Sequence, residues 1–120
     1  MNRSSNGTYA NFLILDDVLE INFHPDVDLN QTILNQVVME KNVFMLTQDA
    51  LPELYDVSSV ASIQFQDAKQ LQETDLKIAV YAKEQHEDDI HRMEEMLASD
   101  KADKEIFDDK DKARLWLSGG

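Results

Sequence analysis

The chain of 120 residues contains no cysteine and only three glycines and two prolines. Without cysteine there is no disulfide, no thiolate nucleophile and no cysteine-ligated zinc or iron–sulfur site. Phosphate-cradling loops use glycine so that backbone N–H groups can approach the ligand, but the glycines here are Gly7 and the terminal pair Gly119 and Gly120. Walker-type and dinucleotide-binding loops are therefore excluded.

Long hydrophobic runs and basic residues are also scarce. No stretch reaches the ~18 apolar residues of a membrane-spanning helix, and residues 1–10 lack the apolar core of a signal peptide. We therefore expect a cytoplasmic protein without stable membrane insertion. The 24 acids outnumber the 11 bases, giving a formal net charge of −13, and twelve of the acids lie within residues 84–111. Such a surface repels nucleic acid and favours solubility or a basic protein partner.

Candidate catalytic and metal-binding side chains do not form a recognisable pattern. The histidines are His24, His86 and His91, and none lies in a motif with a nucleophilic serine. On a helix, Glu87 and Glu95 would share a face with His91, but the sequence contains no second ligand group for a four-coordinate zinc site. We predict no catalytic residues, no metal site and no cofactor, and hence a protein that is not an enzyme.

The N-terminal part predicts a β-hairpin. Residues 9–15 form an apolar run, Asp16 and Asp17 supply turn chemistry, and residues 18–23 alternate, with Leu19 and its alternate neighbours on one face. We expect residues 1–8 to be a flexible N-terminus and residues 9–120 to form a single domain.

The central part, residues 51–82, is typical of a βαβ unit. An apolar strand at 51–57 leads into a turn with several serines, a stretch of helical periodicity follows around 65–72, and residues 76–82 are almost continuously apolar. A strand without a polar face must be covered on both sides, which indicates parallel pairing. Ligand and partner sites of such sheets lie at the carboxyl ends of the strands.

Three further helices complete the expected order ββαβαβαβα. Asp28 with Gln31 resembles a capping box for a helix that ends near residue 41. A second acidic helix is expected over 86–98, and a final helix, capped by Asp108 or Asp109, follows a short edge strand at 105–107. The expected core aromatic residues are Phe12, Phe23, Phe65, Phe107 and Trp116. Residues 44–46 are apolar beyond the first helix and could either cover the sheet or form a contact surface.

Three segments together resemble a STAS domain, the fold of bacterial anti-sigma-factor antagonists, and more narrowly the STAS/SEC14-type proteins. Residues 18–25 are similar to the second strand and its exit, residues 54–63 to the strand and loop written D-hydrophobic-S-G-V-x-x-I, and residues 105–117 to the closing strand and A-x-x-W-L helix. The resemblance implies an α/β fold (an α+β mixed sheet) of four to five strands, with helices packed on the sheet.

The chain departs from the antagonist pattern at the phosphorylation site. Where the antagonists have D-S-S-G, alignment on Asp56 places residues 64–67, Gln-Phe-Gln-Asp. Glutamine neither accepts a phosphate nor mimics one, so we expect no phosphorylation switch there. The serines nearby are alternatively explained as turn residues and, for Ser62, as a helix N-cap. Residues 84–104 are also more acidic than in the STAS/SEC14 relatives, which disfavours membrane docking.

The leading hypothesis is a non-catalytic STAS-like regulatory module that binds a protein through the loop and helix after the third strand. The candidate partner-binding residues are Asp56, Ser58, Ser59, Ser62, Gln64 and Gln66. One alternative is a carrier or sensor of a small, lipid-like apolar ligand in a STAS/SEC14-type pocket. Another is a homodimer built on residues 45–46 or on the edge strand at 106–107.

Overall fold

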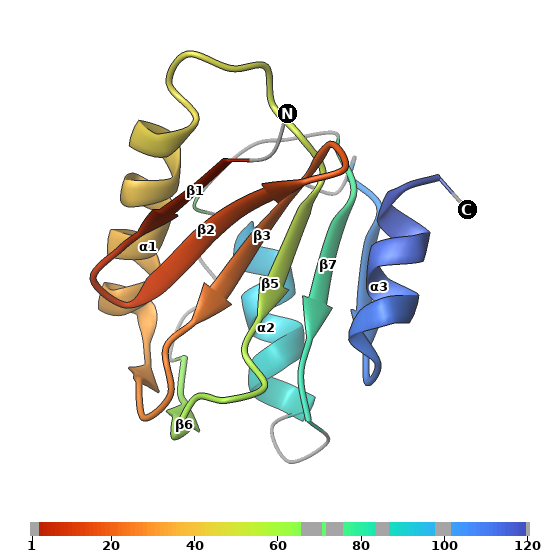
Figure 1. Cartoon of the computed structure of the whole chain (residues 1–120). Helices are drawn as coiled ribbons and strands as arrows, with labels where there is room; N and C mark the ends of the chain where they lie inside the picture. The colour runs from red at the N-terminus through yellow and green to blue at the C-terminus, as the bar shows by residue number, and fades with distance from the viewer. Residues whose placement is uncertain (1–2, 66–70, 72–75, 84–86, 98–101, 120) are drawn as a thin grey trace.

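A computed structural model describes residues 3–65, 71, 76–83, 87–97 and 102–119. In these residues the chain forms a mixed sheet of six strands in the order β1-β2-β3-β5-β7-β8, flanked by three helices (Figure 1). The α/β class with a mixed sheet agrees with the prediction. The sheet has one strand more than the largest number expected, because β1 (Arg3–Asn6) pairs antiparallel with β2.

The predicted hairpin is confirmed. Strands β2 (Ala10–Leu15) and β3 (Val18–Phe23) pair antiparallel, and Asp16 and Asp17 form the two-residue turn. Both aspartates have positive φ, 52° and 62°, as a two-residue hairpin turn with the right-handed strand twist requires. Residues 3–6, which belong to the segment expected to be flexible, form β1. The flexibility of residues 1–8 stays a prediction.

The other half of the sheet is parallel, as the apolar strands indicated. Strands β5 (Glu53–Asp56), β7 (Ile78–Tyr81) and β8 (Lys104–Phe107) continue from β3, each parallel to its neighbour. Strand β8 is the edge strand of the described sheet, which confirms the position predicted for it.

A second, two-stranded sheet corrects the predicted roles of Asp28 and Ser62. Strand β4 (Asp28–Leu29) pairs parallel with β6 (Ser62–Ile63), and the Ser62 hydroxyl donates a 2.8 Å hydrogen bond to Asp28. Neither residue caps a helix. The N-cap of α1 (Gln31–Phe44) is Asn30, whose side chain accepts a 3.0 Å hydrogen bond from the Ile33 amide.

The remaining helices lie close to their predicted positions. Helix α2 (Glu87–Leu97) buries its apolar side, including Ile90 and Met93, and α3 (Lys110–Leu117) is capped by Asp109. The Asp109 carboxylate accepts from the amides of residues 111 and 112. The helix expected around residues 65–72 lies largely outside the described residues.

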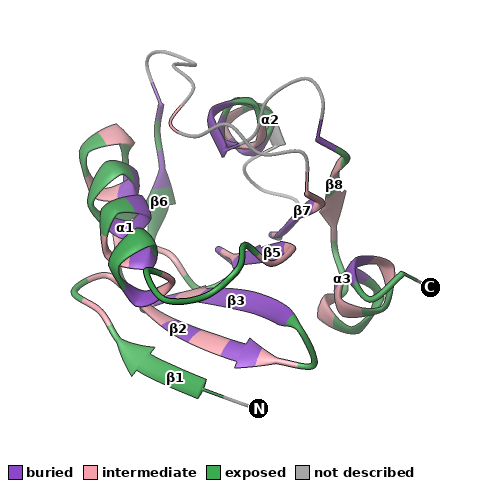
Figure 2. Cartoon of the chain, turned by 90° about the horizontal axis from the view of Figure 1, so that it is seen from above, coloured by how far each residue is buried: buried purple, intermediate pink, exposed green. Residues whose placement is uncertain are grey.

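The two faces of the sheet are covered differently (Figure 2). Helices α1 and α2 cover one face and enclose the main core, which includes Leu19, Ile21, Tyr55 and Val80. Helix α3 covers the β5–β7–β8 half of the other face, where a smaller cluster forms around Leu54, Ala79 and Ala113.

The predicted core aromatic residues divide into two groups. The side chains of Phe12, Phe23 and Phe65 are buried. Phe107 and Trp116, which we expected to be buried, are half-buried, because they lie at the rim of the smaller cluster. Their rings pack beside each other, with centroids 5.6 Å apart. None of the described helices is long and apolar enough to cross a membrane.

Candidate functional site

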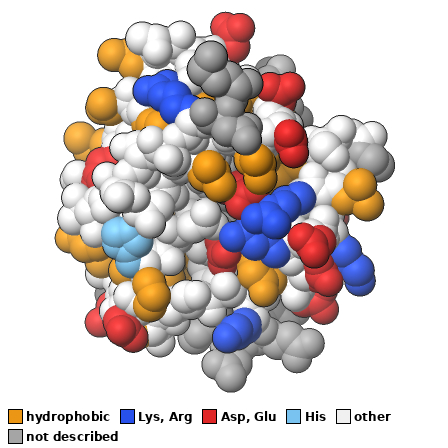
Figure 3. Space-filling model, in the orientation of Figure 1, with side chains coloured by type: hydrophobic (Ala, Val, Ile, Leu, Met, Phe, Trp, Pro, Cys, Tyr) orange, Lys and Arg blue, Asp and Glu red, His pale blue; other side chains and the backbone are white. Residues whose placement is uncertain are grey.

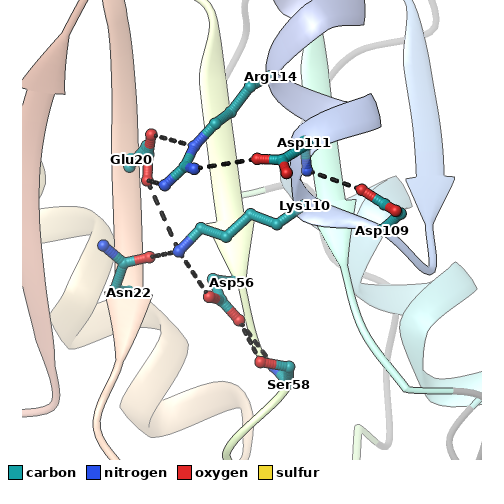
Figure 4. A network of polar contacts seen from close by, with 8 residues as sticks. All are labelled: Glu20, Asn22, Asp56, Ser58, Asp109, Lys110, Asp111 and Arg114. Atoms are coloured by element: carbon teal, nitrogen blue, oxygen red, sulfur yellow. Dashed lines mark hydrogen bonds and ion pairs between the residues drawn. The ribbon is translucent and has the colours of Figure 1, made fainter.

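Six polar side chains meet on the α3 side of the sheet, between β3, β5 and the first two turns of α3 (Figure 4). They are Glu20, Asn22, Asp56, Ser58, Lys110 and Arg114. We call this group the α3 polar cluster. The alternation of β3 places Glu20 and Asn22 on this face, because Leu19, Ile21 and Phe23 occupy the opposite, core-facing side. Lys110 and Arg114 are four residues apart and therefore share one face of α3.

Glu20 is the most deeply buried member of the cluster, with only 1% of its surface exposed. Its carboxylate accepts two hydrogen bonds from the guanidinium of Arg114, at 2.8 Å from Nε and 3.0 Å from Nη2. These bonds raise the pKa of Arg114. A buried carboxylate is tolerated only when it is paired and hydrogen-bonded, and this bidentate geometry meets that requirement.

Lys110 links the two strands through one ammonium group. It donates 2.8 Å hydrogen bonds to Asn22 of β3 and to Asp56 of β5, and its Nζ lies 3.6 Å from Glu20 Oε1. The N-terminal turn of α3 is thereby tied to two adjacent strands.

Asp56 ends β5 and holds the following loop. Its Oδ1 accepts hydrogen bonds from both the amide and the hydroxyl of Ser58, at 3.0 and 2.6 Å, while Oδ2 binds Lys110 at 2.8 Å. Burial by itself raises the pKa of Asp56, but the hydrogen bonds from Lys110 and Ser58 outweigh it, so the pKa lies below the usual value. Asp56 is thus an ionised anchor that joins the loop to α3.

The candidate partner-binding residues therefore fall into separate places. Asp56 and Ser58 belong to the α3 polar cluster, and Ser59 is exposed at the turn beside them. Ser62 binds Asp28 in the small β4–β6 sheet.

Gln64 is exposed, and its backbone N–H donates a hydrogen bond to the Leu29 carbonyl. It lies next to a shallow depression beside the start of α1. Gln66 lies outside the described residues. The structure brings together Asp56, Ser58 and Ser59 at one end of β5, whereas Ser62 and Gln64 lie along the β4–β6 pair.

Four members of the cluster were not among the candidates from the sequence: Glu20, Asn22, Lys110 and Arg114. A signal for them was present. The alternation of residues 18–23 leaves Glu20 and Asn22 on the face away from the core, and two cations recur with a spacing of four on the final helix. The pairing itself joins residues 88 and 94 positions apart and could not be obtained from a local pattern.

A shallow groove adjoins the cluster. Its volume is about 240 Å³, and residues of the β2–β3 turn region and of α3 line it, including Leu15, Glu20, Arg114 and Leu115. Figure 3 shows basic side chains beside acidic ones near the middle of this face, next to hydrophobic side chains. The surface beside α3 therefore offers charge, hydrogen-bonding groups and apolar area together.

The chemistry of the cluster is that of fixed ion pairs. Each carboxylate is paired with a cation, and Ser58 donates a hydrogen bond to Asp56, whose lowered pKa makes it a weak base. Among the residues that the structure describes, no group of three or more His, Asp or Glu side chains is placed to hold a metal ion. In comparisons with protein families, curated proteins and solved structures, nothing matches this chain.

Proposed function

We propose that this chain is a non-catalytic, STAS-like regulatory module that binds a protein partner through the loop after β5. The observation that carries the proposal is the fixation of this loop by Asp56, which binds Ser58 on one oxygen and Lys110 on the other. Residues 58–61 follow the carboxyl end of a parallel strand, where such sheets commonly bind ligands and partners.

The geometry of the loop suits protein binding. Ser59 and Ala61 are exposed, whereas Val57 is buried and Ser58 is held by two hydrogen bonds, so the loop is anchored beneath its exposed surface. A loop that is ordered before binding loses little conformational entropy in the complex.

The α3 polar cluster offers no reactive group for catalysis. A nucleophilic serine needs a neighbouring base that takes its proton, and the neighbour of Ser58 is the ionised, weakly basic Asp56. The cations of Lys110 and Arg114 are committed to carboxylates of the same chain. The cluster accordingly fastens α3 and the loop to the sheet.

The test is a quantitative pull-down from the native cell extract with three forms of the protein. Ser59→Arg places a bulky cation on the exposed loop turn and is expected to reduce recovery of the partner at least tenfold. Asn35→Arg adds the same side chain at an exposed position of α1 and is the matched control, with recovery expected to equal the wild type. Equal recovery with all three forms would contradict the loop as the binding surface.

The alternative function, a carrier of a small apolar ligand, is favoured by one feature. An open groove of about 590 Å³ between β1 and α1 is lined in part by Phe12, Met39, Val43 and Phe44. Native mass spectrometry of protein purified from its own cells tests this alternative. A stoichiometric lipid would support the carrier, and its absence together with a co-purifying protein would support the interaction module.

A further inference from the structure

The groove between β1 and α1 combines two unpartnered features on one side of the molecule. The first is the apolar row formed by Met39, Val43 and Leu46, which are 62%, 72% and 79% exposed. Met39 and Val43, four residues apart, share one side of α1 and line the groove, and Leu46 follows in the turn after the C-cap residue Met45. Only Leu115, far along the chain on α3, is a comparably exposed large hydrophobic side chain in the described residues.

The second feature is the outer edge of β1. The amide of Gly7 bonds to the carbonyl of Ala10, and hydrogen-bonded pairs alternate along an antiparallel ladder, so Arg3 and Ser5 bond to β2. The N–H and C=O groups of Ser4 and Asn6 consequently point away from the sheet. Within the described part of the chain these groups have no hydrogen-bond partner.

This face also differs from the rest of the molecule in charge. The groove lining contains one base, Arg3, and one acid, Glu40, in a chain of net charge −13. Arg3 lies over the ring of Phe44 at 4.5 Å, and Glu40 accepts a hydrogen bond from the Thr8 amide. Two copies of so acidic a chain can approach closely only where each presents a nearly neutral surface.

We propose that the β1–α1 face binds a second copy of this chain, with the two β1 strands paired antiparallel across a two-fold axis. The register that uses all four outward groups places Ser4 opposite Asn6 of the other copy, and vice versa, giving four hydrogen bonds around a central Ser5–Ser5 pair. The six-stranded sheets of the two copies then become continuous, and the two apolar rows on α1 lie on the same side of the joined sheet.

The same register gives charge complementarity. Arg3 of one copy falls opposite Gly7 of the other, and the Glu40 carboxylate lies against Gly7, 2.8 Å from the position that a Cβ would occupy there. Arg3 and Glu40 are on the helix-covered side of the hairpin, since Arg3 contacts Phe44 of α1. Arg3 of each copy thus lies near Glu40 of the other copy, so the single base and the single acid of this face are paired twice across the two-fold axis. An unrelated partner would not be expected to carry charges in matching positions.

Because the chain contains no cysteine, a single introduced thiol tests the register directly. In a non-hydrogen-bonded antiparallel pair the Cα atoms are about 4.5 Å apart, within the range that a disulfide spans. Ser5→Cys is therefore expected to form an intermolecular disulfide rapidly under mild oxidation. Ser4→Cys is the matched control, because the two thiols would be offset by two residues, about 8–9 Å apart, beyond that range.

Mass measurement by light scattering provides the second readout. The wild type is expected at twice the chain mass of 13.8 kDa, and Val43→Glu, which places a charge in the apolar row, is expected at 13.8 kDa. Leu115→Glu makes the same change at an exposed leucine outside this face and is expected to stay dimeric.

Circular dichroism checks that the variants fold. If Val43→Glu is unfolded, Asn6→Pro takes its place, because proline at this position removes only an outward-pointing N–H group of an edge strand. Wild-type protein that stays at 13.8 kDa over the whole accessible concentration range would overturn the proposal, and so would a lipid-bound monomer. Equal cross-linking of Ser4→Cys and Ser5→Cys would overturn the register.

Discussion

The ion pair between Glu20 and Arg114 gives the sharpest stability prediction, because its two members differ greatly in exposure. The side chain of Glu20 is 1% exposed, whereas that of Arg114 is 40% exposed and that of Lys110 is 25% exposed. Removing the arginine leaves a charge in the interior. Removing the glutamate leaves two cations that can reach water.

The magnitudes follow from this asymmetry. Leaving a buried charge without its partner costs about 3–5 kcal/mol, and Lys110, 3.6 Å away, compensates part of it, so Arg114→Met is expected to cost about 3 kcal/mol. Glu20→Met places an apolar side chain of similar length in the interior and is expected to cost only about 0–1 kcal/mol. The double variant should cost about as much as Glu20→Met alone, which gives a coupling energy of roughly 3 kcal/mol.

Urea denaturation of the four proteins measures these differences, with midpoints converted to free energies of unfolding through a common slope. The reasoning would be refuted if Glu20→Met cost as much as Arg114→Met, or if the two effects were additive in the double variant. Either result would show that Glu20 is not buried against α3 as the structure has it.

Three further predictions concern other polar and aromatic contacts. Asp56→Asn is expected to lower the free energy of unfolding at pH 7 by about 1–3 kcal/mol. Folding lowers the pKa of Asp56 below 3.8, so above pH 3.8 the wild type keeps its full stability difference over Asp56→Asn. This difference is lost as the pH falls through the folded pKa, and the urea midpoints of the two proteins should therefore converge in acid. Burial raises the pKa of Glu94 above 4.5, so the ionised form is unfavourable in the folded state, and Glu94→Gln should stabilise the protein at pH 7 by less than about 1 kcal/mol. This gain should vanish as the pH falls below 4.5, where the carboxyl is protonated in both states; a gain that persists in acid would refute it. Trp116→Ala should cost about 1–3 kcal/mol, which is less than the loss of a fully buried tryptophan. The ring is only half-buried against Phe107, and Lys77 Nζ lies 5.0 Å from its centroid. An unchanged urea midpoint would show that these contacts are not made.

The sequence predicted those elements whose signals are local. Alternation and the Asp16–Asp17 pair identified the hairpin, and the apolar runs at 51–57 and 76–82 identified parallel strands. The caps show the limit of such signals. Asp28 and Asn30 are both good N-cap residues, and the choice between them is made by the pairing of β4 with β6, which brings Ser62 to Asp28 across 34 positions.

The candidate site was predicted in part for the same reason. Asp56 and Ser58 form a contact within three residues of chain, and they were selected because residues 54–63 resemble the STAS strand and loop. Lys110 and Arg114 reach the strands only after α3 folds back over the sheet, and their partners are 54 to 94 positions away. Long-range charge pairing of this kind depends on topology, which one sequence does not specify.

The central claim, that the loop fixed by Asp56 binds the partner, is tested most directly by site-specific photo-cross-linking in the native cell. A photoreactive side chain at Ser59 is expected to cross-link a single protein in high yield, whereas the same group at exposed Asn35 on α1 is expected to give no such product. Cross-linking of that protein from Asn35 and not from Ser59 would contradict the account.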